Sequence, residues 1–142
     1  MKSQHKLIWK VAIITLCMVS AYLLLVVGSL DFKCVNEVIS ETLSPDGSMR
    51  VVVFERSCGA TTGFSTQVSI LPSSRELNDR GGNVFVSDTN HGAAPSGPGG
   101  GPEVSVVWQN STSLVLRYHP KARVFLAENQ FSGIHIQYDT SQ

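Results

Sequence analysis

The sequence predicts an all-β fold behind one apolar N-terminal helix. Residues 11–30 form a run of twenty residues without a charge. After this run, short stretches of alternating apolar and polar residues are separated by Gly, Pro, Asn and Asp, and no apolar stripe with helical spacing recurs. We therefore expect one N-terminal transmembrane helix followed by a small antiparallel β-sandwich or curled sheet of about seven strands.

The uncharged run is long enough to cross a bilayer. A helix of twenty residues spans roughly 30 Å, the thickness of the hydrocarbon core. Lys2, Lys6 and Lys10 precede the run, so the positive-inside rule places the N-terminus in the cytoplasm. The expected division is a basic N-terminus (1–10), a signal anchor (11–30) and an extracytoplasmic β domain (31–142). A cleaved signal peptide is the alternative, but its apolar region usually runs only about 7–15 residues.

The net charge of the residues after the apolar run argues against one class of partner, nucleic acid. The chain carries 11 basic and 11 acidic residues, and three of the basic ones precede the apolar run. The remaining 112 residues carry 8 basic and 11 acidic residues, a net charge of −3. A nucleic-acid partner is not expected, because such proteins present a basic surface. The expected partners are the lipid bilayer and another envelope protein.

Turn residues and β-branched residues locate the strands. Ser44-Pro45-Asp46-Gly47 is typical of a hairpin turn, and Val51-Val52-Val53-Phe54 follows it. The runs typical of strands are 48–55, 65–71, 83–87, 103–108, 113–119, 122–126 and 133–139, and 35–43 is a candidate for one more.

Alternation also predicts which side chains face the core. In three C-terminal strands the apolar residues recur at every second position. The residues expected on inward faces there are Val104, Val106, Trp108, Leu114, Leu116, Tyr118, Ile134, Ile136 and Tyr138.

The first hairpin predicts a disulfide between Cys34 and Cys58. If Pro45-Asp46-Gly47 is the hairpin loop, Ser44 faces Ser48, and opposed residue numbers sum to about 92 throughout an unbroken ladder. Cys34 and Cys58 then lie directly opposite each other, close enough for a bond that an oxidising compartment favours. The same register pairs Val38 with Phe54, Ile39 with Val53, Thr42 with Arg50 and, unfavourably, Glu37 with Glu55. A β-bulge would shift the pairing by one residue.

Several short strings together resemble a known group of proteins. These are Ser44-Pro45-Asp46-Gly47, Cys58-Gly59-Ala60-Thr61-Thr62-Gly63-Phe64-Ser65-Thr66, Asn83-Val84-Phe85 and Gly100-Gly101-Pro102-Glu103-Val104. The chain resembles uncharacterised small bacterial single-pass envelope proteins that carry a Cys-Gly-Ala-Thr-Thr loop, and the resemblance covers most of residues 40–140. It implies a bacterial origin and an envelope location. Together with the apolar run and the basic residues before it, this predicts a place in the bacterial inner membrane with the C-terminal domain in the periplasm. The resemblance implies no activity, because that group has none assigned.

Two loops are the candidate contact sites, because functional residues concentrate on loops held by a rigid sheet. The first is Cys58–Thr66, and the second, Asp88–Pro102, contains five glycines and three prolines. This composition predicts few buried contacts and the fastest amide exchange in the domain for 88–102. The candidate contact residues are Gly59, Ala60, Thr61, Thr62, Gly63, Asp88 and His91.

No pattern predicts a catalytic, cofactor or metal site. His91, His119 and His135 lack a partner at ligand spacing, and no Gly-x-Ser-x-Gly elbow is present. The loop threonines are expected to hydrogen-bond their own backbone. The preferred function is a membrane-tethered, non-enzymatic binding or interaction module. The alternative is an envelope hydrolase that uses Cys58 or a loop hydroxyl, and a secreted form after signal-peptide cleavage also stays open.

Overall fold

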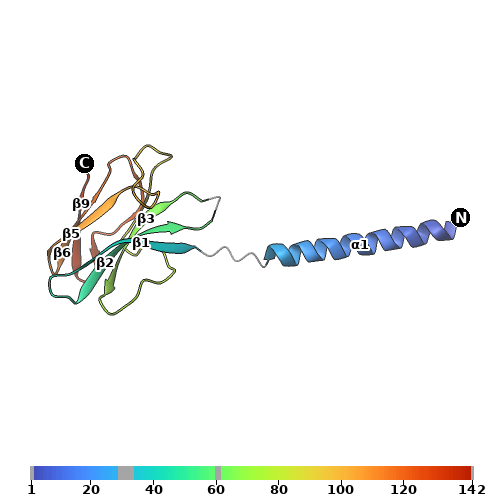
Figure 1. Cartoon of the computed structure of the whole chain (residues 1–142), viewed down its shortest axis with the longest axis horizontal. Coiled ribbons are helices and arrows are strands. Elements are labelled where there is room, and N and C mark those ends of the chain that lie inside the picture. Colours follow the sequence, from blue (N-terminus) through green and yellow to red (C-terminus); the bar gives the residue numbers. More distant parts are fainter. Residues whose placement is uncertain (1, 29–33, 60–61, 142) are drawn as a thin grey trace. The chain divides into compact units, whose positions relative to one another are not determined.

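The computed structural model describes residues 2–28, 34–59 and 62–141 (Figure 1). The chain divides into two compact units, Met1–Phe32 and Lys33–Gln142. The first unit contains the helix and the second contains the strands.

Helix α1 spans Lys2–Gly28 and begins well before the predicted apolar run. Its segment Ile8–Gly28 has a mean hydropathy of 2.5 and is long and apolar enough to cross a membrane. Trp9 and Tyr22 on this segment are 72% and 68% exposed. The predicted end of this segment, at residues 29 and 30, lies outside the described residues.

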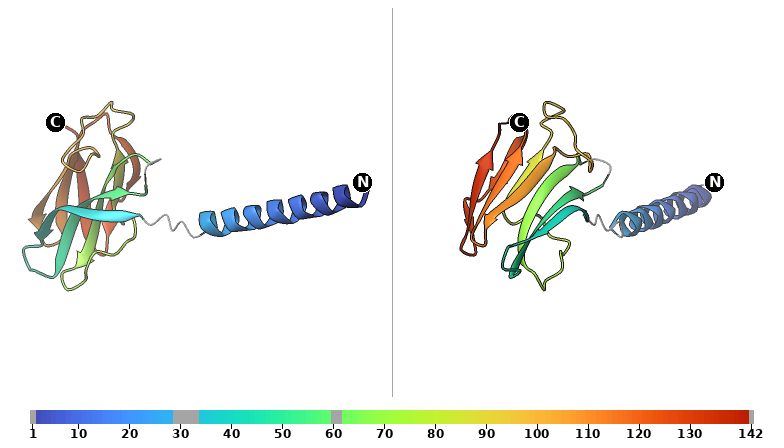
Figure 2. Two further views of the ribbon diagram at one scale, coloured as in Figure 1. Left: turned by 45° about the vertical axis from the view of Figure 1, so that its right-hand side comes forward. Right: turned by 60° about the vertical axis from the view of Figure 1, so that its left-hand side comes forward.

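The second unit is a sandwich of two sheets, which appear as separate layers in Figure 2. The five-stranded sheet has the order β1-β2-β3-β4-β7 and the four-stranded sheet has the order β5-β6-β9-β8. The strands are β1 (Val35–Leu43), β2 (Met49–Ser57), β3 (Ser65–Pro72), β4 (Phe85–Asp88), β5 (Val104–Asn110), β6 (Ser113–Tyr118), β7 (Arg123–Ala127), β8 (Gln130–Phe131) and β9 (Ile134–Asp139).

The core lies between the two sheets and is built from alternating residues, as predicted. Phe85 is fully buried and packs on Tyr118 and Tyr138, with ring centroids 5.0 and 5.8 Å away. The other buried members of the core are Val51, Val53, Val68, Ile70, Val84, Val104, Leu114, Leu116, Ile134 and Ile136. All nine residues predicted on the inward faces of the C-terminal strands are buried in this core or pack against it.

The topology differs from the prediction in two respects. The predicted antiparallel sheet is wrong for β6 and β9, which pair in parallel. Strand β7, which lies between them in sequence, explains this, because it belongs to the other sheet and the chain must cross over before it returns as β9. The two-residue strand β8 was not predicted, since it is too short to show an alternating pattern.

The first hairpin contains a bulge, and the predicted disulfide is present. Ser44 pairs with Met49 rather than with the predicted Ser48, which shifts the register near the turn by one residue. A bulge at Ile39 shifts it back, so Val38 faces Phe54 as predicted, whereas the predicted pairs Ile39–Val53 and Thr42–Arg50 are wrong.

The restored register brings the two cysteines together. Glu37 faces Glu55, as predicted, and from this pair the ladder continues to Val35 at the start of β1. Cys34 and Cys58 form a disulfide with their Cα atoms 4.0 Å apart. A bulge was expected to spoil this alignment. The bulge at Ile39 instead compensates for the turn, which is one residue longer than predicted.

The connection between β3 and β4 covers the outer face of the five-stranded sheet. Val52 and Phe54 point away from the core but are fully buried. Side chains of the same face hold the connection: Asn36 donates to the carbonyls of Asn78 and Arg80, both at 2.8 Å, and Arg56 donates to the carbonyl of Asp79 at 2.7 Å. This layer fixes β1 and β2 next to the disulfide, where the first candidate loop begins.

Candidate functional site

The two candidate loops meet at one end of the sandwich. Together with the start of β7 they line a cavity of about 320 Å³. The lining residues are Gly63, Phe64, Asp88, Thr89, His91, Gly100 and Arg123. Three of the sequence-predicted contact residues, Gly63, Asp88 and His91, therefore share one cavity.

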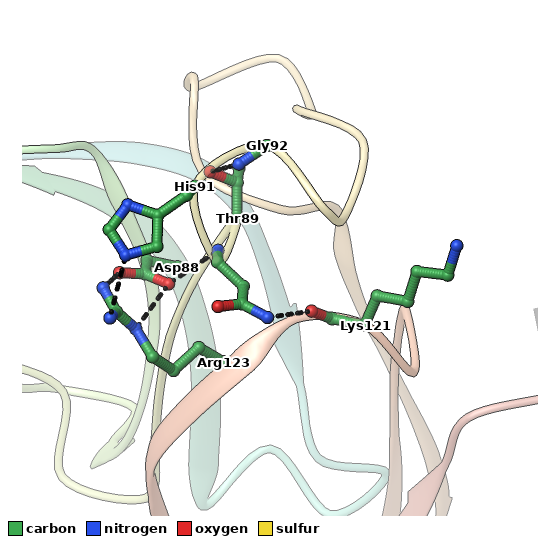
Figure 3. A network of polar contacts seen from close by, with 7 residues as sticks. Asp88, Thr89, His91, Gly92, Lys121 and Arg123 are labelled. Atoms are coloured by element: carbon green, nitrogen blue, oxygen red, sulfur yellow. Dashed lines mark hydrogen bonds and ion pairs between the residues drawn. The ribbon is translucent and has the colours of Figure 1, made fainter.

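An ion pair forms the polar wall of the cavity (Figure 3). Arg123 donates through Nε to Asp88 Oδ1 at 3.1 Å and through Nη2 to Asp88 Oδ2, so the carboxylate is held by both arms of the guanidinium. The Nη1 atom of Arg123 lies 3.5 Å from Nε2 of His91. The guanidinium carbon also lies 5.0 Å from the ring centroid of Phe125. Arg123 is thus fixed in position before any ligand arrives.

Two opposing effects set the pKa of Asp88. Partial burial alone raises the pKa of this carboxyl, because it disfavours the charged form. The hydrogen bond from Arg123, the backbone N–H of Asn90 and the electrostatic effects of Arg123 and His91 outweigh burial and lower the pKa below its usual value. Asp88 is therefore ionised at neutral pH.

Replacing Asp88 with Asn is expected to cost about 1 kcal/mol of stability at pH 7, because Arg123 loses a partly buried charged partner. Since folding lowers the pKa of Asp88, its contribution is present above the usual carboxyl pKa and is lost as the pH falls through the folded-state pKa. Urea unfolding at neutral and acidic pH checks this. Asp79→Asn is the matched control, because the interaction described at Asp79 uses its carbonyl. The prediction would be contradicted if the difference in free energy of unfolding between wild type and Asp88→Asn were the same at acidic pH as at neutral pH.

His91 lies on an unusual stretch of backbone. Asn90, His91 and Gly92 have φ angles of 52°, 57° and 86°, three consecutive residues in the left-handed region. Non-glycine residues rarely adopt this conformation, and such strain is common at functional sites. The turn is held by Asp88, which accepts the Asn90 N–H at 2.8 Å, and by Ala94, whose N–H donates to the Thr89 carbonyl at 3.0 Å.

The glycine-rich part of the second loop forms a small hairpin packed on the sheet. Ser96 pairs with Pro102, and the N–H of Gly97 donates to the carbonyl of Gly101 at 2.7 Å. The hydroxyl of Thr66, on β3, donates to the carbonyl of Pro102 at 2.7 Å.

This packing corrects the expectation that 88–102 makes few buried contacts. Ala94 is 1% exposed, and Pro102 is fully buried. Four of the five glycines are in close contact with neighbouring atoms: Gly97, Gly99, Gly100 and Gly101. A Cβ on Gly101, for example, would lie 2.5 Å from Thr66 Oγ1 and 2.6 Å from Thr66 N.

The loop after Cys58 is closed by one threonine, as predicted for the loop hydroxyls. The Thr62 hydroxyl donates to the carbonyl of Gly59 at 3.0 Å and accepts the Cys58 N–H at 3.2 Å. Gly59 has a φ of 109°, which favours glycine. The candidate residues Ala60 and Thr61 lie outside the described residues.

Among the described residues, the groups considered for hydrolysis are engaged in structural contacts. The disulfide occupies the thiol of Cys58, so this cysteine is no free nucleophile. The hydroxyls of Ser65 and Thr66 donate to the main-chain carbonyls of Arg56 and Pro102.

The histidines are spread over the domain. Of the histidines that the structure describes, His91 alone lines the cavity, whereas the Nδ1 atom of His119 accepts the Lys121 N–H at 3.1 Å. His135 is exposed on β9. Within the described ranges, no three His, Cys, Asp or Glu side chains are grouped closely enough to hold a metal ion.

Sequence reasoning missed the residues that complete the site. Phe64 and Phe125 are 50% and 60% exposed, which is unusual for large aromatic side chains. Arg123 and Phe125 sit on the outward positions of β7. The alternation of Arg123, Phe125 and Ala127 with Val124 and Leu126 is a sequence signal for these outward positions, but inward and outward faces were predicted only for three other C-terminal strands.

Comparison with known proteins adds no assignment. Scans against protein-family models, curated proteins and solved structures found no match to this chain.

Proposed function

We propose that this protein is a membrane-tethered binding module without enzymatic activity. In this proposal α1 anchors the chain in the bacterial inner membrane, with the N-terminus in the cytoplasm and the β domain in the periplasm. The domain contacts another envelope protein through one surface, made by Phe64, His91, Arg123 and Phe125, which we call the loop surface. The observation that carries the proposal is that two loops far apart in sequence converge on one cavity beside these residues.

The composition of the loop surface suits protein recognition. Aromatic residues and Arg are the side chains that contribute most often to binding energy at interfaces. Phe64 and Phe125 offer large exposed rings, and Arg123 is already oriented by Asp88. A side chain that is ordered before binding loses little conformational entropy on association, which favours affinity.

The tether is supported by the apolar helix Ile8–Gly28 and by the lysines that precede it. A reporter that is active only in the periplasm, fused after Gln142, tests it. The fusion should be active and should stay in the membrane fraction. An inactive reporter would contradict the orientation, and a soluble active product would show that the segment is cleaved.

Site-specific photocrosslinking tests the contact surface. A photoreactive amino acid at Phe64 is compared with the same amino acid at Gln137, an exposed position on β9, in the cells that make the protein. The proposal predicts a discrete adduct from position 64 that Arg123→Ala weakens, and none from position 137. Equal labelling at both positions would contradict the proposal. So would an adduct at position 64 that Arg123→Ala does not weaken.

A further inference from the structure

A groove runs along the other side of the glycine-rich hairpin, between that hairpin and β1. It consists of two adjoining cavities of about 210 and 260 Å³ that share Ile39, Pro98 and Gly99. Gly99 lies so close to β1 and β2 that a Cβ there would be 2.9 Å from the Cβ of Glu55 and 3.1 Å from Ile39 Cδ1. The packed hairpin therefore forms a fixed wall, and β1 forms the opposite wall.

Strand β1 is an open edge of the five-stranded sheet. An edge strand presents unpaired N–H and C=O groups to an incoming strand. Over the part of the chain that the structure describes, one side-chain bond reaches the β1 main chain, from the Trp108 indole to the Thr42 carbonyl at 3.3 Å. That bond lies near the turn, whereas the groove lies beside Glu37, Val38 and Ile39. Val38 is 51% exposed there.

The groove is lined by carboxylates without a cationic partner in the described residues. Glu37 and Glu55 face each other across β1 and β2, and Glu103 lines the adjoining cavity. By contrast Glu41, also on β1, is paired with Arg50 at 2.9 Å. Partial burial and the charge of Glu37 raise the pKa of Glu55 above its usual value, as expected for like charges placed together. A cationic side chain in this groove would relieve the repulsion.

We propose that the groove binds an extended basic peptide segment of another protein, which pairs with β1 as an added strand and places Lys or Arg side chains beside Glu37 and Glu55. Main-chain pairing supplies affinity in this mode, and the alternate side chains supply specificity. This binding surface does not depend on the loop surface.

Charge argues against a second copy of this chain as the occupant. Strand β1 contains two glutamates and no basic residue, so pairing β1 with itself would bring like charges together. The bulge at Ile39 also interrupts the regular edge that self-pairing needs. A basic strand avoids the charge repulsion because its charges complement the groove, and on the Glu37 side it pairs with the part of β1 that precedes the bulge.

The test uses the full-length protein in detergent micelles and a capped peptide, Lys-Val-Lys-Thr-Lys-Val-Lys. Binding is measured by fluorescence anisotropy, and amide hydrogen exchange locates it. The peptide should slow exchange in β1, and the double variant Glu37→Gln, Glu55→Gln should bind roughly tenfold more weakly. Glu128→Gln, an exposed carboxylate outside the groove, should bind as the wild type does. The double variant should unfold no earlier than the wild type, because it removes a like-charge pair.

Four results would overturn the proposal. They are no binding of the basic peptide, equal binding of a peptide with Glu in place of Lys, a loss of affinity in Glu128→Gln equal to that in the double variant, and slowed exchange outside β1. If the protein instead forms a concentration-dependent dimer, and amide exchange in β1 slows without peptide, the β1 edge binds a second copy of the chain. None of these results bears on crosslinking at Phe64, so this proposal and the loop-surface proposal fail separately.

Discussion

Replacing both bridging cysteines, Cys34→Ser with Cys58→Ser, is expected to lower the free energy of unfolding of the β domain by about 3 kcal/mol. The bond joins positions 24 apart in sequence. Closing a loop of this size restricts the unfolded chain and is worth roughly 3 kcal/mol in the chain-entropy model. In the folded state the bond also fastens the start of β1, an edge strand, to the end of β2.

Urea unfolding followed by tryptophan fluorescence measures this loss. Cys17→Ser is the matched control, because Cys17 is a free cysteine on α1 and should leave the unfolding midpoint unchanged. Adding a reductant to the wild type should reproduce the double variant, and should not change the double variant itself. If the reductant left the free energy of unfolding of the wild type unchanged, the predicted contribution of the disulfide would be contradicted.

Replacing Gly101 with Ala is expected to destabilise the domain by about 2–3 kcal/mol. The added methyl would lie 2.6 Å from the backbone nitrogen of Thr66, and a backbone atom in a sheet cannot move aside. Inserting a methyl group into a packed region typically costs about 1–3 kcal/mol. Because this contact is so short, we expect a cost in the upper part of that range. The displaced hairpin would also weaken the hydrogen bond from Thr66 to Pro102.

Gly63→Ala is the control, because a Cβ there meets no atom within 4 Å. Thermal and urea unfolding should show a large loss for the Gly101 variant and a loss below about 0.5 kcal/mol for the Gly63 variant. Equal stability of the two variants would mean that the hairpin is not packed on Thr66.

Local patterns predicted the core well, because burial in a sandwich repeats every second residue. Leu114, Leu116, Ile134 and Ile136 are buried as the alternation indicated. The parallel pairing of β6 and β9 could not be predicted in this way, because it depends on which sheet β7 joins.

The first hairpin shows how a correct prediction can rest on a partly wrong ladder. The turn is one residue longer than expected, and the bulge at Ile39 compensates for it, so Cys34 still reaches Cys58. Neither feature has a sequence signal of its own here, since Ile39 is an ordinary strand residue. Only the sum of the two shifts matters for the disulfide.

The candidate site was predicted in part. The loops were identified by composition, but glycine content was interpreted as mobility, whereas Gly99 and Gly101 permit contact with Glu55 and Thr66. Arg123 was missed because its role depends on pairing with Asp88, 35 residues earlier in the chain. A contact of this kind depends on strand order, which a single sequence does not reveal.

Amide hydrogen exchange in the second loop tests most directly whether this end of the domain is a preformed surface. The N–H groups of Ala94, Gly97 and Gly100 donate to the carbonyls of Thr89, Gly101 and Gly97. In the full-length protein without a partner, these amides should exchange at least roughly a hundredfold more slowly than in an unstructured chain. Exchange at the unstructured rate across 94–100 would contradict the account, because the cavity wall and the groove wall would then not exist before binding.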